Sequence, residues 1–109
     1  MNEPSVIRRG LTEALKLLRK PSGQPDLVDR EIRTRAQAAS DYLHRRERTL
    51  RACDSQAGGY DTVLDGLTHA LRLLDAPTDQ PDLDRGEIRT RLIDASEYLR
   101  LREHTLAAA

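Results

Sequence analysis

Residues 10–52 and 66–108 are two copies of one sequence pattern, and they align without a gap at a constant offset of 56. Of the 43 aligned positions, 26 carry the same amino acid in both copies. A repeat of this kind predicts that each copy folds in the same way and that the copies bury their apolar faces against each other. The chain is therefore interpreted as a tandem duplication, with repeat one at 5–53, a linker with a Gly-Gly pair at 54–60 and repeat two at 61–109.

The first part of each copy has apolar residues at intervals of three and four. This spacing places them on one face of an α-helix. The residues are Ile7, Leu11, Ala14, Leu15 and Leu18 in repeat one and Val63, Leu67, Ala70, Leu71 and Leu74 in repeat two. Ser5 and Asp61 occupy equivalent positions and are expected to be the N-cap residues of these helices. Pro21 and Pro77 are expected to end them, because proline cannot continue the hydrogen-bond ladder.

The second part of each copy has the same spacing over a longer stretch and predicts a helix of about 24 residues. Its apolar face is formed by Ile32, Ala36, Ala39, Leu43 and Leu50 in repeat one and by Ile88, Leu92, Ala95, Leu99 and Leu106 in repeat two. In repeat two, Asp84 followed by Glu87 resembles a capping box, and Leu83 with Ile88 resembles a hydrophobic staple. The second helix of repeat two is therefore predicted to begin at Asp84.

A short helix and a long helix joined by a short loop form a hairpin, which is too small to be stable alone. Leu17 and Leu73 widen the apolar arc of the first helix, as expected for a helix with two neighbours. We therefore predict a single all-α domain over 1–109, in which two duplicated hairpins pack as an antiparallel four-helix bundle. Gly10 and Gly66 lie at the edge of the apolar arc and are expected to permit close approach of a neighbouring helix.

One flank of the long helix is the same in both copies, whereas its outer face has diverged. The flank contains Glu31, Arg35, Tyr42, Arg46 and Thr49, matched by Glu87, Arg91, Tyr98, Arg102 and Thr105. Two interpretations are open: the arginine stems cover the protein's own apolar surface, or the flank binds a partner. The partner hypothesis uses Arg35, Tyr42, Arg46, Arg91, Tyr98 and Arg102 of the flank, together with Arg33, Arg89, Ile93 and Leu101 on the outer side. Arg33 and Arg89 recur near the start of each long helix, where a bound carboxylate or phosphate is the alternative to a solvated helix face.

The net charge of zero is a cancellation between two oppositely charged halves. Residues 1–53 contain 12 basic and 7 acidic side chains, which gives +5, and residues 54–109 contain 6 basic and 11 acidic side chains, which gives −5. Opposite charges favour docking of the halves within one chain or between chains. We therefore expect a non-enzymatic protein–protein interaction protein, an adaptor, scaffold or regulator, that forms a homodimer through its complementary charged halves.

A cluster of arginines in repeat one motivates an alternative function. Arg45, Arg46, Arg48 and Arg51 form the densest basic stretch of the chain, and a basic face can neutralise phosphates. However, no aromatic side chains are interleaved for base stacking, and the acidic half would repel a nucleic acid. A small nucleic-acid-associated regulator is therefore the second expectation.

The sequence lacks the common patterns of enzymes and metal sites. None of His44, His69 and His104 has a second histidine or a cysteine three or four residues away, and there is no Gly-rich phosphate loop or nucleophile elbow. Cys53, the single cysteine, excludes an intrachain disulfide. No apolar run approaches the roughly 20 residues of a membrane span, and the N-terminal residues do not resemble a signal peptide. We expect no catalytic residues, metal or cofactor, no membrane association, and a cytoplasmic location. The preference for arginine over lysine suggests a bacterial or phage genome.

Overall fold

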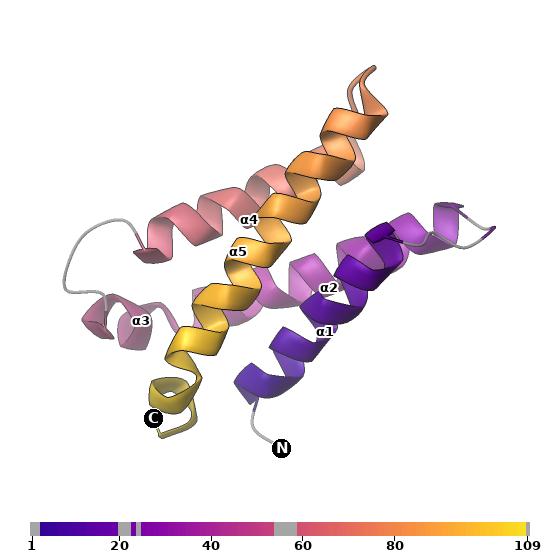
Figure 1. Cartoon of the computed structure of the whole chain (residues 1–109). Coiled ribbons are helices and arrows are strands. Elements are labelled where there is room, and N and C mark those ends of the chain that lie inside the picture. The colour runs from indigo at the N-terminus through magenta and orange to yellow at the C-terminus, as the bar shows by residue number, and fades with distance from the viewer. Residues whose placement is uncertain (1–2, 20–22, 24, 54–58, 109) are drawn as a thin grey trace.

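A computed structural model of the chain describes residues 3–19, 23, 25–53 and 59–108. These residues form five helices, shown in Figure 1: α1 (Glu3–Arg19), α2 (Pro25–Arg45), α3 (Glu47–Cys53), α4 (Gly59–Asp75) and α5 (Pro81–Ala108). No β-strand occurs within these ranges. The prediction of an all-α protein is confirmed.

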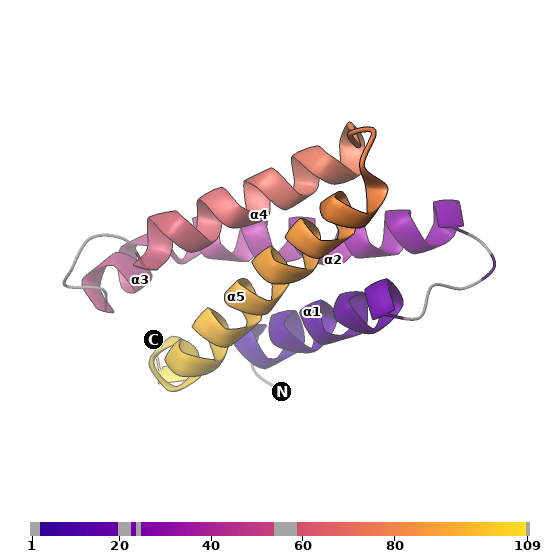
Figure 2. The same cartoon turned by 45° about the horizontal axis from the view of Figure 1, so that its top comes forward.

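The helices pack together as a bundle. The helix α1 contacts both α2 and α5, and α4 contacts the same two helices, so each of these four helices has two long neighbours. Figure 2 shows α5 beside α1 on one side of the molecule and α4 beside α2 on the other. The short helix α3 continues from α2 and touches α4 and α5. Two neighbours per long helix explain why the apolar arcs are wider than a single seam.

Helices in the two halves of the chain begin at equivalent positions. The helices α1 and α4 both have 17 residues and start 56 positions apart, and α2 and α5 start at Pro25 and Pro81, also 56 apart. The core follows the same offset, with buried pairs at Leu11/Leu67, Ala14/Ala70, Ile32/Ile88, Ala39/Ala95, Leu43/Leu99 and Leu50/Leu106. Each fully buried leucine or isoleucine contributes about 1.5–3 kcal/mol relative to an exposed one. The predicted apolar faces therefore meet in one core.

The predicted N-caps of the first helix in each copy are wrong. Because α1 begins at Glu3 and α4 begins at Gly59, Ser5 and Asp61 are each the third residue of a helix rather than the residue before it. The expected linker 54–60 ends earlier than predicted, because Gly59 and Tyr60 belong to α4. Residues 54–58 lie outside the described ranges. Proline is tolerated in the first turn of a helix, so Pro4 does not prevent this early start.

Asp84 is not an N-cap either, because α5 begins three residues earlier at Pro81. Its buried carboxylate instead accepts hydrogen bonds from the backbone N–H and the hydroxyl of Thr78, at 2.8 Å and 2.7 Å. The Thr78 hydroxyl oxygen in turn accepts from the Gln80 N–H at 3.1 Å. Leu83, expected to form a staple, is 66% exposed. The first turn of α5 thus fixes the loop before it by polar contacts.

The long helix of repeat one is interrupted at Arg46, whereas α5 runs without a break for 28 residues. The buried Tyr60 of α4 donates a hydrogen bond from its hydroxyl to the Leu43 carbonyl at 3.0 Å. In a regular helix that carbonyl accepts a hydrogen bond from the N–H of residue 47, where α3 begins. A side chain that competes for a ladder carbonyl is a common cause of a kink. Pro4, which occupies the position equivalent to Tyr60, has no hydroxyl, so α5 has no equivalent competitor.

The protein is expected to lose stability as the pH rises above 10. Burial raises the pKa of the Tyr42 and Tyr60 phenols above their usual value of 10.0. Since the folded-state pKa is raised, the neutral phenols contribute stability that is complete below pH 10 and is lost as the pH rises through the folded pKa. Urea unfolding between about pH 8 and pH 11 measures this decline. A Tyr42→Phe/Tyr60→Phe variant should decline less, and an identical decline in both proteins would contradict the assignment.

Candidate functional site

Arg35 and Arg91, which are equivalent in the two copies, pack against the equivalent glycines Gly10 and Gly66 of the neighbouring helices. A Cβ atom on Gly10 would lie 3.3 Å from Cδ of Arg35, and one on Gly66 would lie 3.0 Å from Cδ of Arg91. Each arginine also forms an ion pair with the glutamate four residues before it, at 2.8 Å and 2.7 Å. The expected close approach at the glycines is therefore made by an arginine stem of the neighbouring helix. This geometry supports a packing role for Arg35 and Arg91.

The two retained tyrosines of the flank are part of the core. Tyr42 is 1% exposed and Tyr98 is 6% exposed, so both rings are buried within the protein's own core. The guanidinium carbon of Arg102 lies 4.1 Å from the centre of the Tyr98 ring. Arg46 is half-buried and donates to the Leu106 carbonyl at 3.4 Å. These retained residues therefore contact the protein's own helices.

Ion pairs link the basic half of the chain to the acidic half. Within the described ranges they are Arg8–Glu103 at 3.3 Å, Arg33–Asp75 at 2.6 Å and Arg51–Asp61 at 2.8 Å. In each of them the arginine belongs to the basic half and the carboxylate to the acidic half. The pairs are partly exposed, so solvent screens them and each contributes little to stability. Some of the opposite charges of the two halves thus pair with each other within the chain, and these ion pairs help to orient one half against the other.

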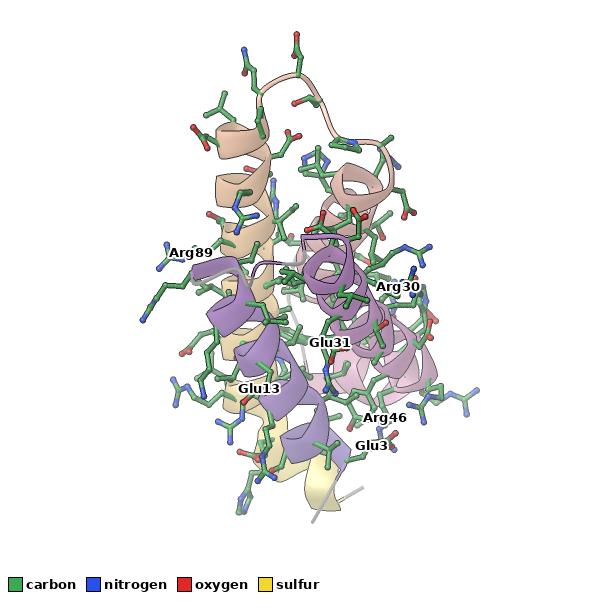
Figure 3. The ribbon with its side chains drawn as sticks, turned by 90° about the vertical axis from the view of Figure 1, so that its right-hand side faces the viewer. Glu3, Glu13, Arg30, Glu31, Arg46 and Arg89 are labelled. Atoms are coloured by element: carbon green, nitrogen blue, oxygen red, sulfur yellow. The ribbon has the colours of Figure 1, made fainter. Side chains whose placement is uncertain are left out.

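A cleft of about 310 Å³ lies between α1 and α5. Its lining residues are Thr12, Leu15, Lys16 and Arg19 of α1 and Arg89 and Ile93 of α5. Lys16 pairs with Glu13 at 3.5 Å, whereas neither Arg19 nor Arg89 forms an ion pair with another described residue. Figure 3 shows the Arg89 side chain extending outward from the bundle. We call this site the basic cleft (Lys16, Arg19 and Arg89, with Leu15 and Ile93).

The side of α5 that faces away from the core carries three exposed apolar side chains. Leu83, Ile93 and Leu101 are 66%, 40% and 63% exposed, and we call Leu83 and Leu101 the α5 outer face. Leu83 and Leu101 are 18 residues apart, which is about five helical turns, so they lie on one line along the helix. Ile93, ten residues after Leu83, lies about 80° around the helix from that line, next to α1 in the basic cleft. The sequence-based expectation for Ile93 and Leu101 as outward-facing residues is met, and Leu83 extends the set.

The arginine cluster of repeat one is dispersed among the protein's own contacts. Arg45 forms an ion pair with Glu3 at 2.8 Å, and Arg51 is bound by a carboxylate of α4. Arg46 is half-buried near Glu3, at one end of the bundle in Figure 3, and Arg48 is exposed. Three of the four guanidinium groups therefore have internal roles, and they do not form one open phosphate-binding face.

No group of three His, Cys, Asp or Glu side chains among the described residues is arranged to hold a metal ion. His69 lies 3.7 Å from a carboxylate oxygen of Glu87, and His44 and His104 are exposed on other parts of the surface. The side chain of Cys53 lies outside the described part of the chain. None of the described helices is long and apolar enough to cross a membrane.

Sequence reasoning did not identify Lys16 and Arg19 as site residues. The alignment of the copies does contain a signal, since Arg19 stands where repeat two has Asp75. The alignment does not show that Arg89, from the other half of the chain, lies in the same cleft as Arg19. The two arginines meet there because α5 packs on α1.

The chain was compared with known protein families, with curated proteins and with solved structures. No family model, curated protein or solved structure matches it. Function is therefore inferred from the α5 outer face and the basic cleft themselves.

Proposed function

We propose that this protein is a non-enzymatic protein–protein interaction module that self-associates through the α5 outer face. The observation that carries the proposal is the exposure of Leu83 and Leu101 on one line of one helix. Single exposed apolar residues are common, but two leucines aligned on one helix, about five turns apart, form a line that a second helix can cover. Covering them removes apolar area from water, which is favourable by about 25 cal/mol per Å².

We also infer that the bundle is a tandem duplication of one helical hairpin with antiparallel helices. The inference is supported by the 26 identities at a constant offset and by the equivalent starting positions of the helices. A short loop between consecutive helices favours antiparallel neighbours. In a duplicated hairpin each residue has an equivalent in the other half. Positions at which the two equivalents differ are therefore informative about function.

The charges next to the α5 outer face favour a second copy of this chain as the partner. Asp82 and Arg100 are also 18 residues apart, so they form a second line beside Leu83 and Leu101, where Arg100 also pairs with Glu97 of its own helix. A two-fold axis near residue 92 would place Leu83 opposite Leu101 of the second copy and Asp82 opposite Arg100 of the second copy. Each contact would occur twice, as an isologous interface requires. The ion pairs within the chain already use part of the charge of the halves, so this helix supplies the stronger argument.

Light scattering over a range of protein concentrations tests the proposal. The wild-type protein is expected to show the mass of a dimer, and Leu101→Asp is expected to weaken the dimer at least about tenfold, because it places a charge in an apolar contact. Leu27→Asp is the matched control, since Leu27 is a similarly exposed leucine on α2. A wild-type protein that remains a monomer at high concentration would refute self-association.

A charge exchange tests the antiparallel register separately. Asp82→Arg and Arg100→Asp are each expected to weaken the dimer, because each places like charges opposite one another. The double variant restores opposite charges in both contacts and should recover the dimer. If the double variant is weaker than either single variant, the two residues are not opposite each other.

The alternative of a nucleic-acid-associated regulator has weaker support. Of Arg45, Arg46, Arg48 and Arg51, only Arg48 is exposed without an ion pair among the described residues. Salt-sensitive retardation of DNA or RNA that disappears in Arg48→Glu would favour this alternative.

A further inference from the structure

We propose that the basic cleft binds the phosphate group of a small phosphate monoester, a function beyond self-association. The cleft brings three cationic side chains from two helices to one hollow of about 310 Å³. That volume is at the lower end of the range for small-molecule sites. The argument for an anion comes from a comparison of this cleft with the equivalent place on the other side of the bundle.

The equivalent place lies between α2 and α4 and contains an ion pair. Arg33 is equivalent to Arg89, and Asp75 is equivalent to Arg19, each at the offset of 56. Arg33 donates from Nε to Oδ1 of Asp75 at 2.6 Å and from Nη2 to Oδ2 at 3.4 Å. A two-pronged contact of this kind is how a guanidinium group holds a carboxylate or a phosphate. In the basic cleft, Arg19 replaces that carboxylate, so two arginines line one cavity.

The charge of the basic cleft fits a dianion. Lys16, Arg19 and Arg89 supply three positive charges, and Glu13, which pairs with Lys16, offsets one of them. The remaining two charges match a phosphate monoester, which carries about −1.5 to −2 at pH 7. An oxyanion in the cleft would take the role beside Arg89 that the Asp75 carboxylate takes beside Arg33.

The end of α1 has a contact that makes this location more favourable for an anion. The last carbonyl groups of a helix carry partial negative charge and repel anions. Arg85 of α5 donates from Nη2 to the Leu18 carbonyl at 2.7 Å, next to Arg19. This hydrogen bond satisfies one of the terminal carbonyls and adds a further positive charge at the end of α1.

The apolar part of the basic cleft indicates what the phosphate is attached to. Leu15 is half-buried, and Ile93 stands where the other half of the chain has Gln37. An apolar side chain at this position offers no hydrogen bond but gives contact area to a hydrocarbon or aromatic group. The ligand class is therefore a phosphate monoester with a small apolar group, in preference to inorganic phosphate alone.

Phenyl phosphate and inorganic phosphate are suitable probes, titrated calorimetrically at constant ionic strength with sodium chloride as the reference. The wild-type protein is expected to bind one phenyl phosphate per chain, more tightly than inorganic phosphate. Arg19→Asp is expected to weaken this binding at least about tenfold, because it supplies Arg89 with its own carboxylate. The variant should remain folded, since the same residue pair is already present between α2 and α4.

A second variant tests the comparison between the two sides. Asp75→Arg converts the α2–α4 side to an arginine pair, next to Arg72, which is equivalent to Lys16. It is expected to raise the number of phenyl phosphate molecules bound per chain from one towards two. An unchanged number would show that an arginine pair at this position does not make a phosphate site, and the proposal would fail.

Three further results would overturn the proposal. Equal binding of phenyl phosphate to the wild type and Arg19→Asp would mean that general surface charge attracts it. Tight oligonucleotide binding that persists in Arg19→Asp, with no response to phenyl phosphate, would assign the basic surface to nucleic acid. A change of dimer mass in Arg19→Asp, again without phosphate binding, would mean that an acidic segment of a second copy occupies the basic cleft.

Discussion

Replacing Leu99 with alanine is expected to lower the free energy of unfolding by about 2–5 kcal/mol. Leu99 is fully buried in the core, so truncation loses its transfer energy and leaves a cavity. A loss of this size is a large part of the roughly 5–15 kcal/mol that stabilises a typical domain. Chemical unfolding followed by circular dichroism measures it, at a protein concentration at which the wild type is monomeric.

Leu101→Ala is the matched control, two residues further along the same helix. Its exposed side chain contributes little to the core, so the change should be within about 0.5 kcal/mol. Leu43→Ala, at the position equivalent to Leu99, should fall in the same range as Leu99→Ala. Similar losses for Leu99→Ala and Leu101→Ala would mean that α5 presents a different face to the core.

Gly66→Ala is expected to destabilise the protein, although alanine is intrinsically better than glycine in a helix by about 1 kcal/mol. The new Cβ would lie 3.0 Å from Cδ of Arg91 and 3.8 Å from its Cβ and Cγ. Arg91 is also held by its ion pair with Glu87, so moving it away disturbs a second contact. Overpacking of this kind costs typically about 1–3 kcal/mol, and because Arg91 is held in place we expect a cost above the gain of about 1 kcal/mol in helix propensity.

Gly86→Ala is the control for this substitution, because nothing lies within 4 Å of the Cβ that it would add. It should stabilise the protein by about 1 kcal/mol through helix propensity alone. Both variants are compared with the wild type by urea unfolding. If Gly66→Ala is stabilised as much as Gly86→Ala, the arginine stem does not constrain this position.

The buried faces of the helices could be predicted from the sequence because spacing alone determines which residues share a face. Leu11, Ile32 and Leu67 illustrate this, since their burial depends only on the helical period. The helix starts were not predicted correctly at Ser5 and Asp61. A capping signal is a preference of about 1 kcal/mol, and an earlier start that adds intrahelical hydrogen bonds and packing can outweigh it.

Contacts between distant residues account for the rest of the differences. The interruption at Arg46 is associated with the hydroxyl of Tyr60, which reaches the Leu43 carbonyl from another helix. The basic cleft likewise depends on Arg19 and Arg89, which are 70 positions apart and meet only through the packing of α1 on α5. Neither juxtaposition leaves a periodic pattern in the sequence, because each depends on a single residue in one copy.

The uninterrupted length of α5 has a consequence for the size of the assemblies that this protein can form. A duplicated chain with the same associating helix in both halves would be bivalent, and bivalent subunits join into closed rings or open filaments. Here the helix of the first half is interrupted at Arg46, and the position equivalent to Leu101 is the charged Arg45. Among the described residues, the uninterrupted helix of the second half carries an exposed leucine near each end, Leu83 and Leu101, whereas Leu43 near the end of α2 is buried. If the chain associates through that helix, it is monovalent, and growth stops at two copies.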